Sequence, residues 1–292
     1  MKGCRVLSNI RLRNKDTTLP QDNCLYINGL RLHYLDWGNN GCQTMLLLHG
    51  FMGHAHVWDN FAINFRSDYH IIALDQRGHG ESEWSKEGAY AIEDYFVDLI
   101  NFVETLGLRD LILIGHSMGG RNALFYAAYN YEKVARLVLI DARPGPSRQS
   151  SQALRHLLAN LPLKAVSIAQ VAQRIHTIYW YLSWKTCYDS ASYAYKQLPN
   201  GTFVPKYDTR MSQQLEYGGY AAEELSHVMQ NIACPTLIVR GEESPFLSRQ
   251  EAKRMCEIIP KADLVEIPRS THLPVQENKE AFNEAILAFL DN

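Results

Sequence analysis

Ser117 stands at the centre of a Gly-x-Ser-x-Gly pattern, GHSMG, at residues 115–119. The apolar run Leu111–Ile114 before it predicts a short buried strand, and residues 121–129 after it predict a helix. A sharp turn between a strand and a helix lifts a serine hydroxyl out of the backbone, and flanking glycines let the turn close. The N-terminus of the helix offers free N–H groups to an oxyanion. This arrangement predicts a nucleophilic serine.

Polar residues also follow other apolar runs, at the points where further strands would end. These residues are His49 after 45–48, Asp75 after 71–74 and Asp141 after 136–140. In an open parallel sheet, sites form at the carboxyl ends of the strands. We therefore expect these residues and Ser117 to lie along one edge of a sheet.

Strand-like and helix-like segments alternate from residue 25 onward, beginning with a hairpin predicted by Asn28-Gly29. Continuous Val, Ile and Leu runs favour a parallel sheet with helices on both faces. The predicted fold class is α/β, a mostly parallel doubly wound sheet of about eight strands. We expect a polar lead-in at 1–22, a core at 23–145 and 232–292, and a helical insert at 146–231.

Composition and charge restrict the classes of partner. The chain has 292 residues, a net charge of −2 and 21% charged residues, which give no electrostatic reason to expect nucleic acid. No apolar run reaches the ~20 residues that span a bilayer, and the charged N-terminus does not resemble a signal peptide. The six cysteines are scattered without metal-like spacing, so we expect a cytoplasmic protein with reduced cysteines and no metal or other cofactor.

Four ordered motifs together resemble the α/β-hydrolase fold family, in its serine-nucleophile branch. They are HGFMG (49–53), DQRGHGES (75–82), GHSMGG (115–120) and STHLPVQ (270–276). The resemblance implies that Ser117 is the nucleophile and His272 the general base. It also implies that the backbone N–H groups of Phe51 and Met118 form an oxyanion hole.

The acid of the triad departs from the most common pattern of this family. The position a few residues after the strand predicted at 236–239 holds Ser244, where many relatives carry an aspartate. A neutral serine cannot stabilise an imidazolium as a carboxylate does. We favour Asp141, which some subfamilies of this fold place one strand earlier, over Glu243 and then Glu242.

The insert contains an aromatic run at 179–184, and such a run is expected in a cap over an active site. We expect Trp180, Tyr181 and Trp184 to line a substrate pocket. The predicted activity is that of a serine hydrolase on a carboxylic ester, thioester or lactone of a small to medium apolar substrate.

Two other kinds of function remain open on this scaffold, and a third is disfavoured. C–C bond hydrolases and lyases keep the same triad, so the motifs separate them poorly from esterases. A non-catalytic ligand-binding protein would be consistent with Ser244 in place of an acid. Epoxide hydrolases and dehalogenases share the fold but use an aspartate nucleophile, and Ser117 argues against both.

Overall fold

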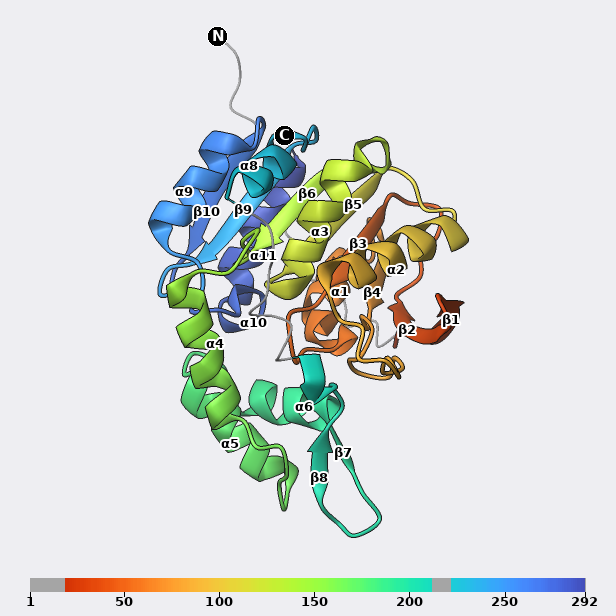
Figure 1. Cartoon of the computed structure of the whole chain (residues 1–292), viewed down its shortest axis with the longest axis vertical. Helices are drawn as coiled ribbons and strands as arrows, with labels where there is room; N and C mark the ends of the chain where they lie inside the picture. Colours follow the sequence, from red (N-terminus) through yellow and green to blue (C-terminus); the bar gives the residue numbers. More distant parts are fainter. Residues whose placement is uncertain (1–18, 212–221, 292) are drawn as a thin grey trace.

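The central feature of the computed structural model, which describes residues 19–211 and 222–291, is an eight-stranded sheet (Figure 1). Its strand order is β1-β2-β4-β3-β5-β6-β9-β10. The strands are β1 (Gln21–Ile27), β2 (Leu30–Asp36), β3 (Thr44–Leu48), β4 (His70–Leu74), β5 (Leu111–His116), β6 (Val134–Ile140), β9 (Thr236–Gly241) and β10 (Ala262–Ile267). β1 and β2 pair antiparallel and β2 is antiparallel to β4, whereas the remaining pairs are parallel. The predicted fold class is confirmed.

The hairpin between β1 and β2 turns at Asn28-Gly29, as predicted. Both residues have positive φ, 51° and 78°, which a tight two-residue hairpin turn requires. Gln21 pairs with Asp36, so regular structure begins within the last two residues of the predicted polar lead-in at 1–22. Residues 1–18 of that lead-in lie outside the described residues.

Helices cover both faces of the sheet because neighbouring residues of a strand point to opposite sides. In β5, Leu113 packs into one hydrophobic cluster and Ile114 into the other. The first face is covered by α2 (Ile92–Thr105), α3 (Met118–Tyr129), α8 (Ala222–Gln230) and α9 (Arg249–Ile258). The second is covered by the short helix η1 (Ala55–Trp58), α1 (Asp59–Phe65) and α11 (Lys279–Leu290).

The insert between β6 and β9 builds a separate layer beyond the carboxyl ends of the strands (Figure 1). It contains α4 (Arg148–Asn160), α5 (Ile168–Ile178), α6 (Trp184–Ala194), β7 (Tyr195–Gln197) and β8 (Phe203–Pro205). A serine caps the N-terminus of each of these helices, with the side chains of Ser147, Ser167 and Ser183 accepting a backbone N–H. The insert has a hydrophobic cluster of its own, centred on Val171, Leu182 and Cys187.

Two features of the insert differ from expectation. The β7–β8 hairpin was not predicted, because these three-residue strands are too short to show an alternating pattern. Helix α8 lies within the predicted insert but packs on the sheet through Val228 and Met229, so the chain returns to the core before residue 232. None of the described helices has both the length and the apolar character needed to cross a membrane.

Candidate active site

Ser117 occupies a strained turn between β5 and α3. Its φ is 51°, in the left-handed region that an L-residue other than glycine rarely adopts. The backbone is closely packed here: a Cβ at Gly119 would lie 2.4 Å from the carbonyl oxygen of Leu48, and one at Gly115 would lie 2.3 Å from that of Gly119. Only glycine fits at these two positions. The packed turn therefore holds the serine hydroxyl at the edge of the sheet.

Ser117, His272 and Asp141 form a continuous chain of hydrogen-bond contacts. Oγ of Ser117 lies 3.0 Å from Nε2 of His272, and Nδ1 of His272 lies 2.6 Å from Oδ2 of Asp141. Asp141 directly follows β6, which is the neighbour of β5 in the sheet. His272 comes from the loop after β10, 131 positions from Asp141 in the sequence. With Nδ1–H directed to the carboxylate, Nε2 is free to accept the proton of the serine.

The two glutamates considered as alternative acids lie elsewhere. Oε1 of Glu243 accepts a hydrogen bond from the hydroxyl of Tyr181 at 2.5 Å, and Oε2 of Glu242 accepts one from the N–H of Arg269 at 3.2 Å. Within the part of the chain that the structure describes, neither glutamate hydrogen-bonds His272. The structure thus brings Asp141, and not these alternatives, to the imidazole.

Ser244, which stands where many relatives carry an aspartate, contacts Asp141 directly. Its Oγ donates a hydrogen bond of 2.5 Å to Oδ2 of Asp141 and accepts from the N–H groups of Phe246 and Leu247. The N–H of Gly241 lies 3.3 Å from the other carboxylate oxygen. Ser244 therefore stabilises the carboxylate at position 141.

Three residues that sequence reasoning did not assign to the site hold His272 in place. Both oxygens of Glu277 accept hydrogen bonds from Thr271, and Oε2 also accepts the N–H of Leu273, so this carboxylate clamps both neighbours of His272. Nε2 of His116 lies 2.7 Å from the carbonyl oxygen of His272, and the ring of Phe246 stacks on the imidazole at 3.8 Å. No motif marks Glu277 or Phe246. His116, in contrast, lies within the GHSMGG motif.

Burial governs the charge state of this site. It lowers the pKa of His272, which favours the neutral imidazole that a general base needs. Burial also raises the pKa of Asp141, while the hydrogen bond from Ser244 acts in the opposite direction. Burial thus keeps the imidazole neutral, and Ser244 acts against the effect of burial on the pKa of Asp141.

Phe51 and Met118 line the same cavity as Ser117, as an oxyanion hole requires. Phe51 follows β3 in the loop at 49–53, and Met118 is the first residue of α3. Neither backbone N–H has an acceptor among the described residues. Two donors are thus available beside the serine hydroxyl.

The cavity beside Ser117 has a volume of about 100 Å³ and is built jointly by the core and the insert. The insert contributes Ser150, Ser151 and Leu154 from α4. Arg121 and Arg143 also line it, but most of its lining surface is apolar.

The three aromatic residues predicted for the pocket do not line this cavity. Trp180 is 56% exposed and Trp184 is 47% exposed, and the Tyr181 hydroxyl bonds Glu243. Their neighbours Tyr179 and Leu182 point inward and fill the core of the insert, which directs the tryptophans to the surface. The apolar surface of the cavity comes from other residues, among them Phe51, Leu154 and Phe246.

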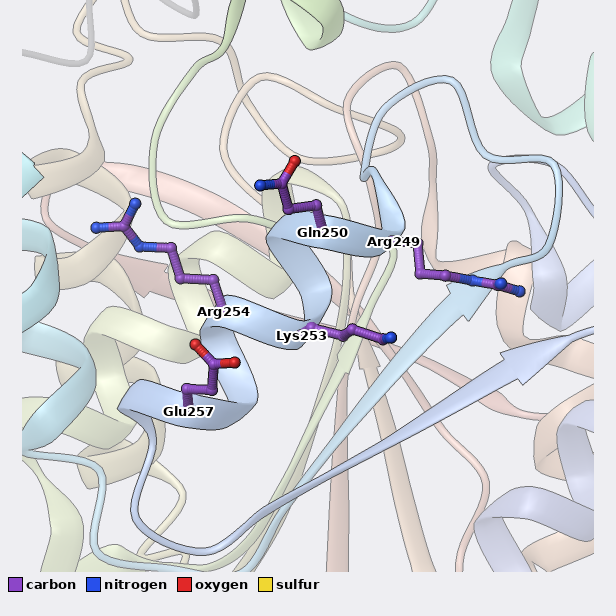
Figure 2. A pocket seen from close by; sticks show the side chains of 5 residues that line it. All are labelled: Arg249, Gln250, Lys253, Arg254 and Glu257. Carbon is purple, nitrogen blue, oxygen red and sulfur yellow. The ribbon is translucent and has the colours of Figure 1, made fainter.

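A second hollow lies on the outer surface of α9, where Figure 2 shows five side chains. They are Arg249, Gln250, Lys253, Arg254 and Glu257. They extend from one helix in different directions and do not converge on a common point. Within residues 19–211 and 222–291, no group of three or more His, Cys, Asp or Glu side chains is arranged to hold a metal ion. The cavity beside Ser117 is thus the candidate site.

A mostly parallel sheet that carries Ser117, Asp141 and His272 at its carboxyl edge defines an α/β hydrolase. A sequence profile described as alpha/beta hydrolase fold matches residues 43–279, and the chain belongs to this family. The relatives below are named hydrolases, and hydrolysis is the general activity that they support.

The relatives differ in how much of the chain they match. Mouse epoxide hydrolase 4 (Mus musculus) is 36% identical over 129 residues, which form 44% of this chain and 36% of that protein. This chain therefore matches little more than a third of that relative's length. 2-(Acetamidomethylene)succinate hydrolase from Mesorhizobium japonicum is 27% identical over 254 residues, 85% of this chain and 87% of that protein.

A solved structure shows the same fold along nearly the whole chain. The crystal structure of E-2-(acetamidomethylene)succinate hydrolase superposes with a TM-score of 0.84 and 26% sequence identity. The superposition covers 94% of this chain and all of that chain. The arrangement of core and insert is thus shared with a hydrolase of this family.

Proposed function

We propose that this protein is a serine hydrolase that cleaves a carboxylic ester, thioester or lactone through an acyl-enzyme. The observation that carries the proposal is the hydrogen-bond chain from Oγ of Ser117 through His272 to Asp141. The strained turn at Ser117 and the two free N–H groups beside it support the same reaction.

The first half of the reaction forms a bond between Oγ of Ser117 and the carbonyl carbon of the substrate. His272 takes the hydroxyl proton at Nε2, and Asp141 stabilises the resulting imidazolium through Nδ1–H. The N–H groups of Phe51 and Met118 bind the oxyanion. The tetrahedral intermediate then expels the alcohol or thiol, which receives the proton from His272.

The second half returns the enzyme to its starting state. His272 takes a proton from water, and the water oxygen attacks the acyl carbon. The bond to Oγ breaks, Ser117 regains its proton from His272, and the carboxylic acid leaves. The reaction needs no cofactor. In this proposal the insert acts as a cap that limits access to the cavity.

The test combines covalent labelling with turnover. A fluorophosphonate probe should label the wild-type protein at Ser117, and Ser117→Ala should abolish labelling. The same change should lower the hydrolysis of short methyl esters by at least about 10³-fold. Equal turnover in wild type and Ser117→Ala would disprove the proposal. A folded wild-type protein that is not labelled would instead indicate a ligand-binding protein.

A further inference from the structure

The ring of Phe246 lies face to face with the imidazole of His272. The two ring centroids are 3.8 Å apart, and the ring planes differ by 22°. Both nitrogens of the imidazole have other partners, Asp141 at 2.6 Å from Nδ1 and Ser117 at 3.0 Å from Nε2. Phe246 therefore contacts the general base through a ring face and does not compete for either hydrogen bond.

The turn after β9 that carries Phe246 also carries Ser244. Oγ of Ser244 donates a hydrogen bond to Asp141 and accepts the N–H of Phe246 at 3.1 Å. Arg240, which is buried in β9, donates from Nε to the carbonyl oxygen of Leu247 at 2.7 Å. The side chain of Phe246 packs against the hydrophobic cluster of the insert. Contacts to the core and to the insert thus fix the phenyl ring on the imidazole.

The imidazole of His272 becomes charged only during the proposed reaction. Burial lowers its pKa, so the ring is neutral before Ser117 attacks, and the serine proton then makes it an imidazolium. The face of a phenyl ring carries the negative part of its quadrupole and attracts a cation, most strongly away from water. A neutral imidazole gains less from the same contact. The contact is therefore stronger in the transition state than in the ground state, and such a difference raises the rate.

The other groups around the imidazole act in different ways. Asp141 stabilises its charge through Nδ1–H. The ring of His116 lies 4.7 Å from that of His272, and burial lowers the pKa of His116 to about 3, so this neighbour stays neutral and does not repel an imidazolium. The carboxylate of Glu277 is bonded to the residues on either side of His272. Within the part of the chain that the structure describes, Phe246 is the ring stacked on the imidazole.

We infer that Phe246 is a positioning residue that stabilises, through its ring face, the imidazolium formed on His272 in both halves of the reaction. This inference rests on the proposed serine hydrolase activity. No bond to Phe246 forms or breaks. The proton of Ser117 moves to Nε2 of His272 and then to the leaving group, and the phenyl ring lowers the energy of the charged state between these transfers. The effect should appear in kcat, because both acyl transfers pass through the imidazolium.

The experiment changes the charge distribution of the ring at 246 and keeps its shape. Phe246 is replaced in turn by monofluorinated, difluorinated and pentafluorinated phenylalanine, because each fluorine withdraws electrons from the ring face. kcat for para-nitrophenyl acetate should fall stepwise along this series, to about 3- to 30-fold below the wild type for the pentafluorinated ring, the range of cation–π contacts. Phe246→Leu should cause a similar loss, whereas Phe246→Tyr, which keeps the π face, should retain most of the activity.

Two controls separate this role from packing and from contact with the substrate. Phe203 packs against the same cluster of the insert, and pentafluorinated phenylalanine at that position should leave kcat within about twofold of the wild type. In a His272→Ala background no imidazolium forms, so adding Phe246→Leu should lower the residual turnover by less than about twofold. A role in packing or in substrate contact would persist in that background.

Two results would overturn the inference while the proposed function stands. One is a kcat that does not fall along the fluorinated series, with Ser117 still labelled by the fluorophosphonate probe. The other is a loss from Phe246→Leu that is as large in the His272→Ala background as in the wild type. Absence of both labelling and turnover in the wild-type protein would overturn the proposed function and this inference with it.

Discussion

Asp141 and Ser244 follow neighbouring strands and contact each other. Asp141 also contacts the imidazole of His272. β6 and β9 pair in parallel with Ile140 opposite Val239, so the residues just beyond them meet at one edge. A second carboxylate at 244 would lie beside Asp141 and repel it at close range in a buried site. A serine there donates a hydrogen bond instead. An acid at position 141 and a serine at position 244 are therefore compatible with each other in this site.

The choice of acid is testable by two single changes. Asp141→Asn should lower kcat/KM by about 10³- to 10⁴-fold, because an amide cannot stabilise the imidazolium and favours the wrong imidazole tautomer. Glu243→Gln should change it by less than about threefold, since Glu243 contacts Tyr181 and not His272. Kinetics on a short methyl ester would measure both. Turnover near that of the wild type in Asp141→Asn would contradict the assignment.

At the scale of elements, the motif at 75–82 joins strands, loops and a helix of the core. Asp75 accepts hydrogen bonds from the His33 ring in β2, the N–H of Ala55 and the N–H of Glu81. Arg77 makes a two-pronged ion pair with Asp98 of α2, at 2.6 and 2.7 Å. Because Ala55 follows the loop at 49–53 that contains Phe51, Asp75 helps to position that loop.

Asp75 should make stability depend on pH in the acid range. Burial alone would raise its pKa, but the hydrogen bond from His33 and other contacts outweigh burial and lower the pKa from 3.8 to about 2. A lowered pKa favours the folded state above pH 4, and this contribution of about 2 kcal/mol is lost as the pH falls toward 2. Asp75→Asn should therefore lower the free energy of unfolding at pH 7 by about 2 kcal/mol.

The difference between wild type and Asp75→Asn should narrow between pH 4 and pH 2 in thermal or urea unfolding. Asp68→Asn is the control, since Asp68 is exposed and its carboxylate accepts a hydrogen bond from the neighbouring Ser67. Stability curves that stay parallel for wild type and Asp75→Asn down to pH 2 would refute this role.

At the scale of the whole molecule, the insert and the core share the construction of the cavity. α4 supplies one wall, and the turn from β5 into α3 and the loops after β3, β6 and β9 supply the others. Met52, Phe246 and Leu273 from the core pack against the hydrophobic cluster of the insert. Changes in α4 should therefore alter substrate choice, whereas changes on the outer surface of the insert should not.

Leu154→Trp should fill part of the cavity and lower kcat/KM for methyl butanoate by about tenfold or more, with less effect on methyl acetate. Trp184→Ala should leave both values within about twofold, because Trp184 is exposed and does not line the cavity. Ester kinetics over increasing acyl length would measure both variants. A larger effect for Trp184→Ala than for Leu154→Trp would restore the aromatic pocket and contradict the cavity described above.

Sequence signals were informative where the structure depends on neighbouring residues. The apolar run before Ser117, the glycines around it and the Asn28-Gly29 turn each act within a few positions, so their outcome is contained in a short segment. The eight-stranded sheet follows from many such segments, since buried strands between helices have few ways to pair. Both the fold class and the strand ends at the site were predictable on these grounds.

Contacts between distant residues could only be read from the tertiary structure. Whether Asp141 or Glu243 contacts His272 depends on the register of strands about 100 positions apart. A pattern within a few neighbouring residues does not determine that register. The outward direction of Trp180 and Trp184 depends on which neighbours fill the core of the insert. The convergence of Arg121 and Arg143 on one cavity depends on how α3 and the loop after β6 pack. The sequence by itself determined the fold and the strained turn at Ser117, whereas the packing of distant segments decided which side chains surround that turn.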